Sequence, residues 1–146
     1  MAERIGSELR RLVAARANHL CEYCLVAEED TYFGCEVDHI ISVKHGGTTE
    51  AENLAYACAF CNRHKGSDIA SLSQRTGLLI HFYNPRADRW ADHFELNGVH
   101  IRPMSEIGEV TARILRFNDG GQILEREALS AIGRYPNASA RLHIES

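Results

Sequence analysis

The stretch EVDHIISVKHGGTTEAENLAYACAFCNRHKG, residues 36–66, decides how the chain folds. Apolar residues predict a strand over 35–43 and a short return strand over 54–57. The polar segment KHGGTTEAEN between them, with Gly46 and Gly47, predicts a tight turn and a loop. A helix is predicted from Cys61 to about residue 70, so the expected order is strand, loop, strand, helix.

Asp38 and His39 stand inside the first predicted strand, where the surrounding residues are apolar. Strand alternation would send the two side chains to opposite faces unless the strand is bent. Burying an unpaired carboxylate is costly, so this pair requires a metal ion or a hydrogen-bond network as its partner.

Four of the five cysteines form two C-x-x-C pairs, Cys21/Cys24 and Cys58/Cys61. Two intervening residues allow both thiolates of a pair to reach one ion, and two pairs complete the four-thiolate set typical of structural zinc. One C-x-x-C pair alone would equally suit a redox dithiol, and iron remains a second metal. The fifth cysteine, Cys35, is interpreted as a small buried apolar residue.

The flanking sequence predicts further short elements. A helix over 7–19 with Ser7 as its cap precedes the first cysteine pair, and 78–83 is predicted to be extended. Asn97-Gly98 predicts a hairpin between 93–96 and 99–102. Helices are expected over 105–117, capped by Ser105, and over 122–133, and the tail after Asn137 is expected to be frayed.

Charge is distributed unevenly along the chain, whose formal net charge is −4. Residues 21–60 carry one lysine and eight acidic residues, whereas 61–90 carry five basic and two acidic residues. Bound cations would offset the acidic block, and the basic block could face phosphate. No apolar run reaches the ~18 residues of a membrane span, and the N-terminus lacks an apolar signal core, so a cytoplasmic protein is expected.

The segment from Cys21 to Gly66 resembles the HNH endonucleases through CEYC, VDHII, HGG, Asn53-Leu54, CAFCN and Lys65. The resemblance implies an α+β fold with a ββα-metal (His-Me finger) core held by a four-cysteine zinc site. We expect one domain over 1–146, with the nuclease core at 7–72 and a β-hairpin and helical extension at 77–146. FYNPRADRWADHFELNG, residues 82–98, more loosely resembles an extension found in a bacterial subset of the family.

The resemblance also implies a reaction, the hydrolysis of DNA to ends carrying a 5′-phosphate and a 3′-hydroxyl. His39 would be the general base, because imidazole titrates near working pH. Asp38 and the Asn62 carbonyl would hold one hard divalent cation, Mg²⁺ or Mn²⁺, while the four cysteines hold Zn²⁺. Asn53 would fix the inter-strand loop through its amide, and so would fix where His39 points.

One motif position departs from the family name, since Asn62 stands where a second histidine is expected. His64 is a rival ligand, but two residues apart on a helix the two cannot easily face the same hairpin. DNA contacts are predicted from charge alone, with Trp90 beside the last two cations and equally consistent with core packing. The predicted contacts are Lys44, His45, Arg63, His64, Lys65, Arg86 and Arg89.

Two other interpretations remain open. The cysteine pairs alone would suit a non-catalytic zinc-stapled adaptor that binds nucleic acid or protein, or a zinc redox switch. The intact Asp38-His39 pair favours the nuclease, because an adaptor has no need of a base beside a metal carboxylate. A homodimer or a targeting protein could supply what the acidic chain lacks in non-specific DNA affinity.

Overall fold

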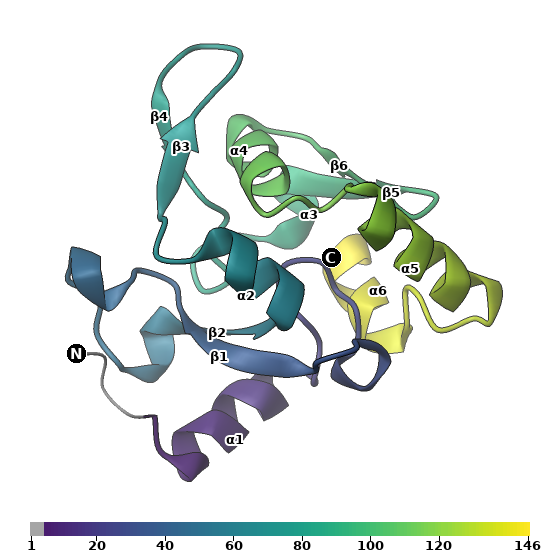
Figure 1. Ribbon diagram of the computed structural model, residues 1–146, viewed down its shortest axis with the longest axis horizontal. Helices are drawn as coiled ribbons and strands as arrows, with labels where there is room; N and C mark the ends of the chain where they lie inside the picture. The colour runs from purple at the N-terminus through teal and green to yellow at the C-terminus, as the bar shows by residue number, and fades with distance from the viewer. Residues whose placement is uncertain (1–4) are drawn as a thin grey trace.

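The computed structural model describes residues 5–146 and consists of short helices and three separate two-stranded antiparallel sheets (Figure 1). This confirms the predicted α+β class. The elements in chain order are α1 (Ser7–Arg16), β1 (Cys35–His39), β2 (Leu54–Cys58), α2 (Ala59–Lys65), β3 (Ala70–Leu72), β4 (Leu79–His81), α3 (Trp90–His93), β5 (Phe94–Asn97), β6 (His100–Pro103), α4 (Glu106–Ile114), α5 (Gly120–Ala131) and α6 (Ala138–Glu145).

The β1–β2 hairpin and α2 form the predicted ββα unit. In the antiparallel register Asp38 lies opposite Ala55 and His39 lies opposite Leu54, so the two polar residues belong to opposite faces of the hairpin. Figure 1 shows α1 on one side of this hairpin and α2 on the other. Val13 and Ala14 of α1 pack against Leu54 of β2 on the first face, and the second face is the one that α2 covers.

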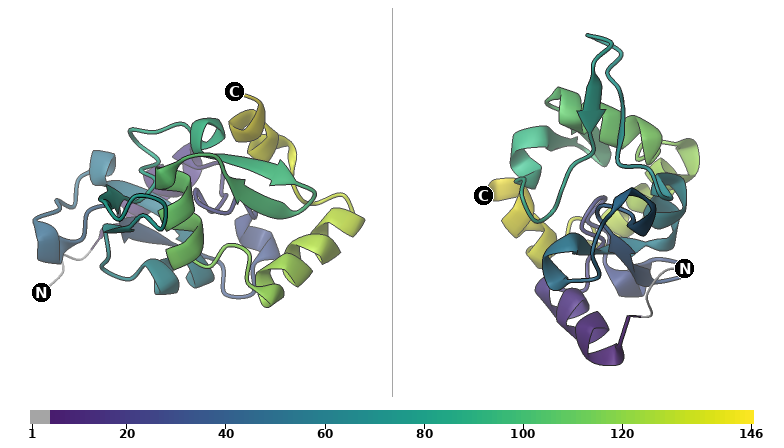
Figure 2. Two further views of the ribbon diagram at one scale, coloured as in Figure 1. Left: turned by 90° about the horizontal axis from the view of Figure 1, so that it is seen from above. Right: turned by 90° about the vertical axis from the view of Figure 1, so that its left-hand side faces the viewer.

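The segment after α2 differs from the expectation. The helix ends at Lys65 rather than near residue 70, and the chain then forms β3, which pairs with β4 in a second hairpin. Figure 2 shows this hairpin as an arm that projects from the rest of the molecule. The sequence predicted an extended segment over 78–83 but missed its partner, because β3 has only three residues and offers no periodic signal.

The predicted hairpin around Asn97 is present, but its turn is displaced by one residue. Asn97 pairs with His100, so Gly98 and Val99 form the two-residue loop. Gly98 has a φ of +64°, which suits the first central position of a hairpin turn that favours glycine. His93, which was expected in a strand, instead ends the short helix α3.

Helix caps explain two further differences. Gly6, not Ser7, is the N-cap of α1, and it provides no side-chain hydrogen bond. Ser105 caps α4 as predicted, with its hydroxyl accepting from the Gly108 N–H at 3.0 Å. The tail after Asn137 is not frayed but forms α6, because the Asn137 side chain caps it and Ala140 is fully buried.

The main hydrophobic cluster spans the chain from Leu20 to Ala140, so the cysteine segment and the C-terminal helices share one core. Trp90, Phe94 and Phe117 form an aromatic series within it. The predicted division into 7–72 and 77–146 remains a prediction. Within residues 5–146, none of the helices combines the length and the apolar character needed to cross a bilayer.

Candidate metal centre and nuclease site

The four cysteines predicted as zinc ligands converge on one point. Their sulfur atoms all lie within 4.8 Å of one another, and all four residues are buried. The Sγ atoms of Cys24 and Cys58 are 3.8 Å apart, close to the ~3.8 Å that separates two sulfurs bound to one tetrahedral zinc at about 2.3 Å. The donor set and its spacing therefore fit a structural Zn²⁺.

The local backbone prepares each pair for this role. The Cys24 N–H donates to the Cys21 sulfur, and the Cys61 N–H donates to the Cys58 sulfur at the N-terminus of α2. Hydrogen bonds with the Cys21 sulfur raise the pKa of Cys24 and of Cys61 well above its ordinary value. Zinc binding would then release protons from the cluster, since thiolates and not thiols are the ligands.

The C-terminal part of the chain holds the first cysteine turn in place. Trp90 Nε1 donates to the carbonyl of Tyr23, and the Tyr135 hydroxyl donates to the carbonyl of Cys24, both at 2.9 Å. Both contacts are buried, so the two aromatic side chains satisfy carbonyls that would otherwise lack a partner away from water. The extension therefore supports the cysteine cluster directly.

Asp38 projects from β1 toward α2 and is almost fully buried. Lys65 Nζ lies 2.9 Å from Asp38 Oδ2 and also donates to the carbonyl of His39 at 2.9 Å. Lys65 is therefore the cationic partner of the buried Asp38 carboxylate. Burial raises the pKa of Asp38, and Lys65 only partly offsets this, which leaves a carboxylate that a cation would stabilise.

Asn62 lies on the same side of α2 as Lys65, three residues earlier, where one helical turn brings both over β1. Its side-chain nitrogen donates to Glu36 Oε2 at 3.0 Å. Because Glu36 and Asp38 are two residues apart in a strand, they share one face. The structure therefore places Asp38 and Asn62 on facing surfaces of β1 and α2, and the carboxylate of Glu36 orients the Asn62 amide.

The loop between β1 and β2 is organised around Asn53. Its side-chain oxygen accepts from the Ile41 N–H, and its nitrogen donates to the carbonyls of Ile41 and Thr48, all between 2.8 and 2.9 Å. Gly47 fits tightly beside it, since a Cβ there would lie 1.7 Å from the Ile41 oxygen. His39 Nε2 in turn is 2.9 Å from the Thr49 hydroxyl, so the same loop orients the imidazole.

The residues predicted to contact DNA fall into two groups. Lys44, His45, Arg63 and Arg89 are exposed, and His64 is partly buried with its ring against Phe60. Lys65 and Arg86 were also expected to contact DNA, but both side chains are paired with acidic residues inside the structure. Lys65 is buried against Asp38, while Arg86 pairs with Glu22 and donates to the carbonyl of Leu54.

Trp90 resolves an alternative that the sequence left open, whereas Cys35 differs from the sequence interpretation. Trp90 is buried, which favours core packing over contact with a base. Cys35 is only half-buried and lies outside the four-cysteine cluster, at the edge of both hydrophobic clusters.

Sequence reasoning missed the partners of the polar residues, namely Glu36 for Asn62, Lys65 for Asp38 and Thr49 for His39. Two of these partners carried a signal in the sequence. Glu36 precedes Asp38 by two residues in a strand, and Lys65 follows Asn62 by three in a helix, so each shares a face with a predicted site residue. Thr49 lies in a loop and had no such signal.

Comparison with known proteins agrees with this geometry. A model of the HNH endonuclease family matches residues 21–68, which include both cysteine pairs, the β1–β2 hairpin and α2. Comparisons with curated proteins and with solved structures gave no match. The family match and the convergent cysteines together identify residues 21–68 as an HNH endonuclease domain with a four-cysteine site suited to zinc.

Proposed function

We propose that the protein is a metal-dependent endonuclease that hydrolyses phosphodiester bonds in DNA. The observation that supports this most is the docking of α2 on β1, which sets Asn62 and the buried Asp38 on facing surfaces, with His39 as the next residue of β1. The two oxygen ligands would hold one hard divalent cation, Mg²⁺ or Mn²⁺, and leave positions for substrate and water.

The chain's own residues would divide the chemistry among them. His39 would accept a proton from the attacking water, and Thr49 would keep the ring in one orientation. Asn53 would hold the loop that carries Thr49, through its three backbone hydrogen bonds. When bound, the divalent cation would neutralise charge on the phosphate and on the departing 3′ oxygen. The products would carry a 5′-phosphate and a 3′-hydroxyl.

The DNA would approach over exposed cations near the proposed cleavage site. Lys44 and His45 lie in the loop after β1, and Arg63 lies on α2 next to Asn62. These are few cations for a nucleic-acid interface, so strong salt-dependent binding is not expected from them alone. A second copy or a targeting protein would then contribute affinity, and the substrate would be DNA in the cytoplasm.

The test is nicking of supercoiled plasmid by purified protein with Mg²⁺ or Mn²⁺, beside a chelator control whose activity is restored by adding the metal back. His39→Ala should lower the cleavage rate by about 10²-fold or more, because a general base contributes roughly 10²–10⁴-fold. His100→Ala, at an exposed histidine of β6, is the matched control and should cleave normally. A His39→Ala protein that cleaves at the wild-type rate would refute the base assignment.

The alternative is a non-catalytic zinc-stapled module that binds nucleic acid or protein. One observation favours it, namely that Asp38 and Asn62 already contact Lys65 and Glu36. The two proposals diverge in the same plasmid assay. Absence of metal-dependent nicking on several DNA substrates, with zinc bound and the fold intact, would favour the adaptor.

A further inference from the structure

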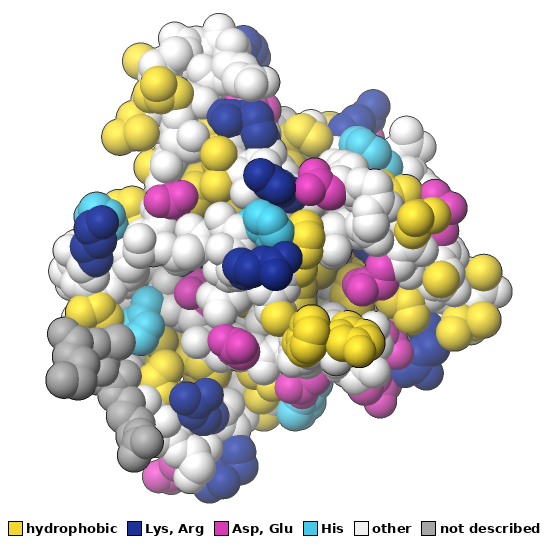
Figure 3. Space-filling view, viewed as in Figure 1, with side chains coloured by type: hydrophobic (Ala, Val, Ile, Leu, Met, Phe, Trp, Pro, Cys, Tyr) yellow, Lys and Arg dark blue, Asp and Glu magenta, His cyan; other side chains and the backbone are white. Residues whose placement is uncertain are grey.

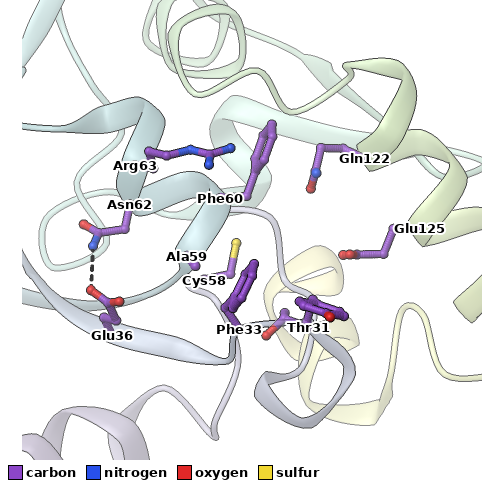
Figure 4. Close-up of a pocket in the computed structure, with 11 residues that line it drawn as sticks. Thr31, Phe33, Glu36, Cys58, Ala59, Phe60, Asn62, Arg63, Gln122 and Glu125 are labelled. Atoms are coloured by element: carbon purple, nitrogen blue, oxygen red, sulfur yellow. Dashed lines mark hydrogen bonds between the residues drawn. The ribbon is translucent and has the colours of Figure 1, made fainter.

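A cavity of about 410 Å³ opens directly beside the proposed cleavage site. Asn62 and Glu36 form one of its edges, so it is continuous with the site on β1 and α2 (Figure 4). Its volume lies within the roughly 300–1,000 Å³ typical of small-molecule pockets. Whatever part of the substrate enters it would therefore lie close to the scissile bond.

Aromatic side chains supply the apolar part of this cavity. Phe33 and Tyr32 pack edge to face, with ring centroids 4.6 Å apart, yet they are 77% and 89% exposed. Phe60 of α2 enters the cavity opposite Phe33 in Figure 4. Two adjacent aromatic residues left in water beside a polar cleft form a surface on which a planar group can stack.

The polar part comes from α5 and α2. Gln122 and Glu125 point from α5 toward the aromatic rings, and Arg63 extends from α2 beside Phe60 (Figure 4). Asn62 donates to Glu36 at the edge of the cavity (Figure 4), whereas no hydrogen bond contributes to the pKa of Glu125, whose oxygens can accept from a ligand. Burial raises the pKa of Glu125, as expected for a carboxylate set in a recess.

The distribution of charge argues for stacking rather than for extended phosphate binding. Figure 3 shows a short central run of Lys, Arg and His side chains flanked by Asp and Glu, and no extended basic surface over the rest of the face viewed. A surface of this kind gains little affinity from counterion release. Base stacking on aromatic side chains is the other main source of affinity for unpaired nucleic acid.

We propose that this cavity receives one unpaired nucleobase of the DNA substrate, stacked on Phe33, Tyr32 and Phe60. The proposal rests on the endonuclease function and narrows its substrate to single-stranded or locally unpaired DNA. The Glu125 carboxylate accepts from an exocyclic amino group such as that of cytosine, and Gln122 matches adenine in the same way. Thymine has no amino group, so the cavity discriminates against it. Arg63 contacts the phosphate next to the bound base.

The test measures binding of fluorescently labelled dC12 and dT12 by anisotropy, with Ca²⁺ in place of the catalytic metal. Wild-type protein should bind dC12 at least about fivefold more tightly than dT12. Tyr32→Ser/Phe33→Ser should weaken binding of both oligonucleotides by about fivefold or more. Glu125→Met, which removes the acceptor oxygens at similar side-chain length, should reduce the preference for dC12 while retaining most of the stacking affinity.

The matched control is Leu78→Ser/Leu79→Ser, which alters two exposed apolar side chains on the β3–β4 arm. It should bind both oligonucleotides as the wild type does, and zinc content should be equal in every variant. Equal binding of dC12 and dT12 by wild-type protein would overturn the proposal. So would unchanged binding by Tyr32→Ser/Phe33→Ser, which would assign the aromatic surface to a different partner.

Plasmid nicking in Mg²⁺ separates this inference from the endonuclease proposal. Nicking by the wild type, together with unaltered binding by Tyr32→Ser/Phe33→Ser, overturns the base cavity and leaves the nuclease standing. A dC12 preference that Glu125→Met reduces, in a protein that nicks no DNA, overturns the nuclease and leaves the cavity as a binding site.

Discussion

The cysteine cluster lies at the start of the short helix α2, and the contacts with Glu36 and Asp38 of β1 follow further along the same helix, yet the two sites are built differently. Cys58 and Cys61 at the start of α2 meet two other thiols at distances that already suit a metal. Asn62 and Lys65, only a few residues further on, each contact an acidic side chain of β1 instead. One site is complete in its ligands, whereas the other holds its carboxylate through a protein cation.

The difference follows from the residues available. Thiols have few good partners in a protein interior other than a soft metal or each other, so two C-x-x-C pairs define their site. Carboxylates and amides accept many partners, and Lys65 would compete with the divalent cation proposed at Asp38. Each prediction below tests one side of this contrast.

The largest effect is expected from breaking the cysteine cluster. Structural zinc contributes on the order of 10–16 kcal/mol in small zinc domains, whereas net domain stability is about 5–15 kcal/mol. Cys58→Ser should therefore lose zinc and most of the helical circular dichroism signal. Cys35→Ser, outside the cluster, should retain both. A Cys58→Ser protein that keeps its native zinc content and helical signal would refute the structural role proposed for the four-cysteine zinc site.

The second prediction concerns the ion pair between Asp38 and Lys65. Lys65→Met leaves the buried Asp38 carboxylate without its cation. Removing one partner of a buried ion pair costs about 3–5 kcal/mol, measured here by urea unfolding. Asp38→Asn/Lys65→Met should regain part of this loss, because no buried charge remains. Added Mg²⁺ should raise the melting temperature of Lys65→Met more than that of the wild type. Equal shifts would argue against a cation at Asp38.

Gly47→Ala should disturb the loop that orients His39 while leaving the cysteine cluster intact. The new methyl group would overlap the Ile41 carbonyl, and overpacking of this kind costs about 1–3 kcal/mol. We expect slower plasmid cleavage at unchanged zinc content. Gly120→Ala, where a Cβ meets open space, is the control and should leave cleavage unaltered.

The smallest loss of stability is expected from removing a hydrogen bond that holds the turn containing Cys21 and Cys24. Tyr135→Phe removes the hydrogen bond to the Cys24 carbonyl and should cost about 1 kcal/mol, or about 2–4 °C in melting temperature. Tyr23→Phe is the informative counterpart, since the Tyr23 hydroxyl is buried without a partner among residues 5–146. That change should be neutral or stabilising. A larger loss for Tyr23→Phe than for Tyr135→Phe would contradict the assigned contacts.

The sequence predicted most of the ββα unit because its signals are local. The cysteine spacing, the glycine turn before Asn53 and the strand alternation around Asp38 each act over a few residues. The partners could not be predicted in the same way. Lys65 was interpreted as a phosphate contact because a lysine in a basic run is ordinarily exposed, and only the packing of α2 on β1 buries it.

The extension was harder to predict for a related reason. In the sequence, Arg86 and Trp90 resemble an exposed basic and aromatic group. In the structure, Arg86 pairs with Glu22 and Trp90 donates to the carbonyl of Tyr23, and these contacts with a distant part of the chain bury Trp90 and leave Arg86 only partly exposed. The three-residue strand β3 has too little pattern to be recognised. The C-terminal helix α6 depends on a cap at Asn137 and on the burial of Ala140, which was not evident from composition.

The hydrogen bonds from Trp90 and Tyr135 to the first cysteine turn span 67 and 111 positions of sequence. A chain emerging from the ribosome therefore presents all four thiols well before the two donors that brace them. Contacts with such large sequence separation form late, because a long loop must close first. Metal capture would begin during synthesis, but the finished cluster would wait for the last quarter of the chain, and a nascent fragment would hold its zinc more loosely than the completed protein.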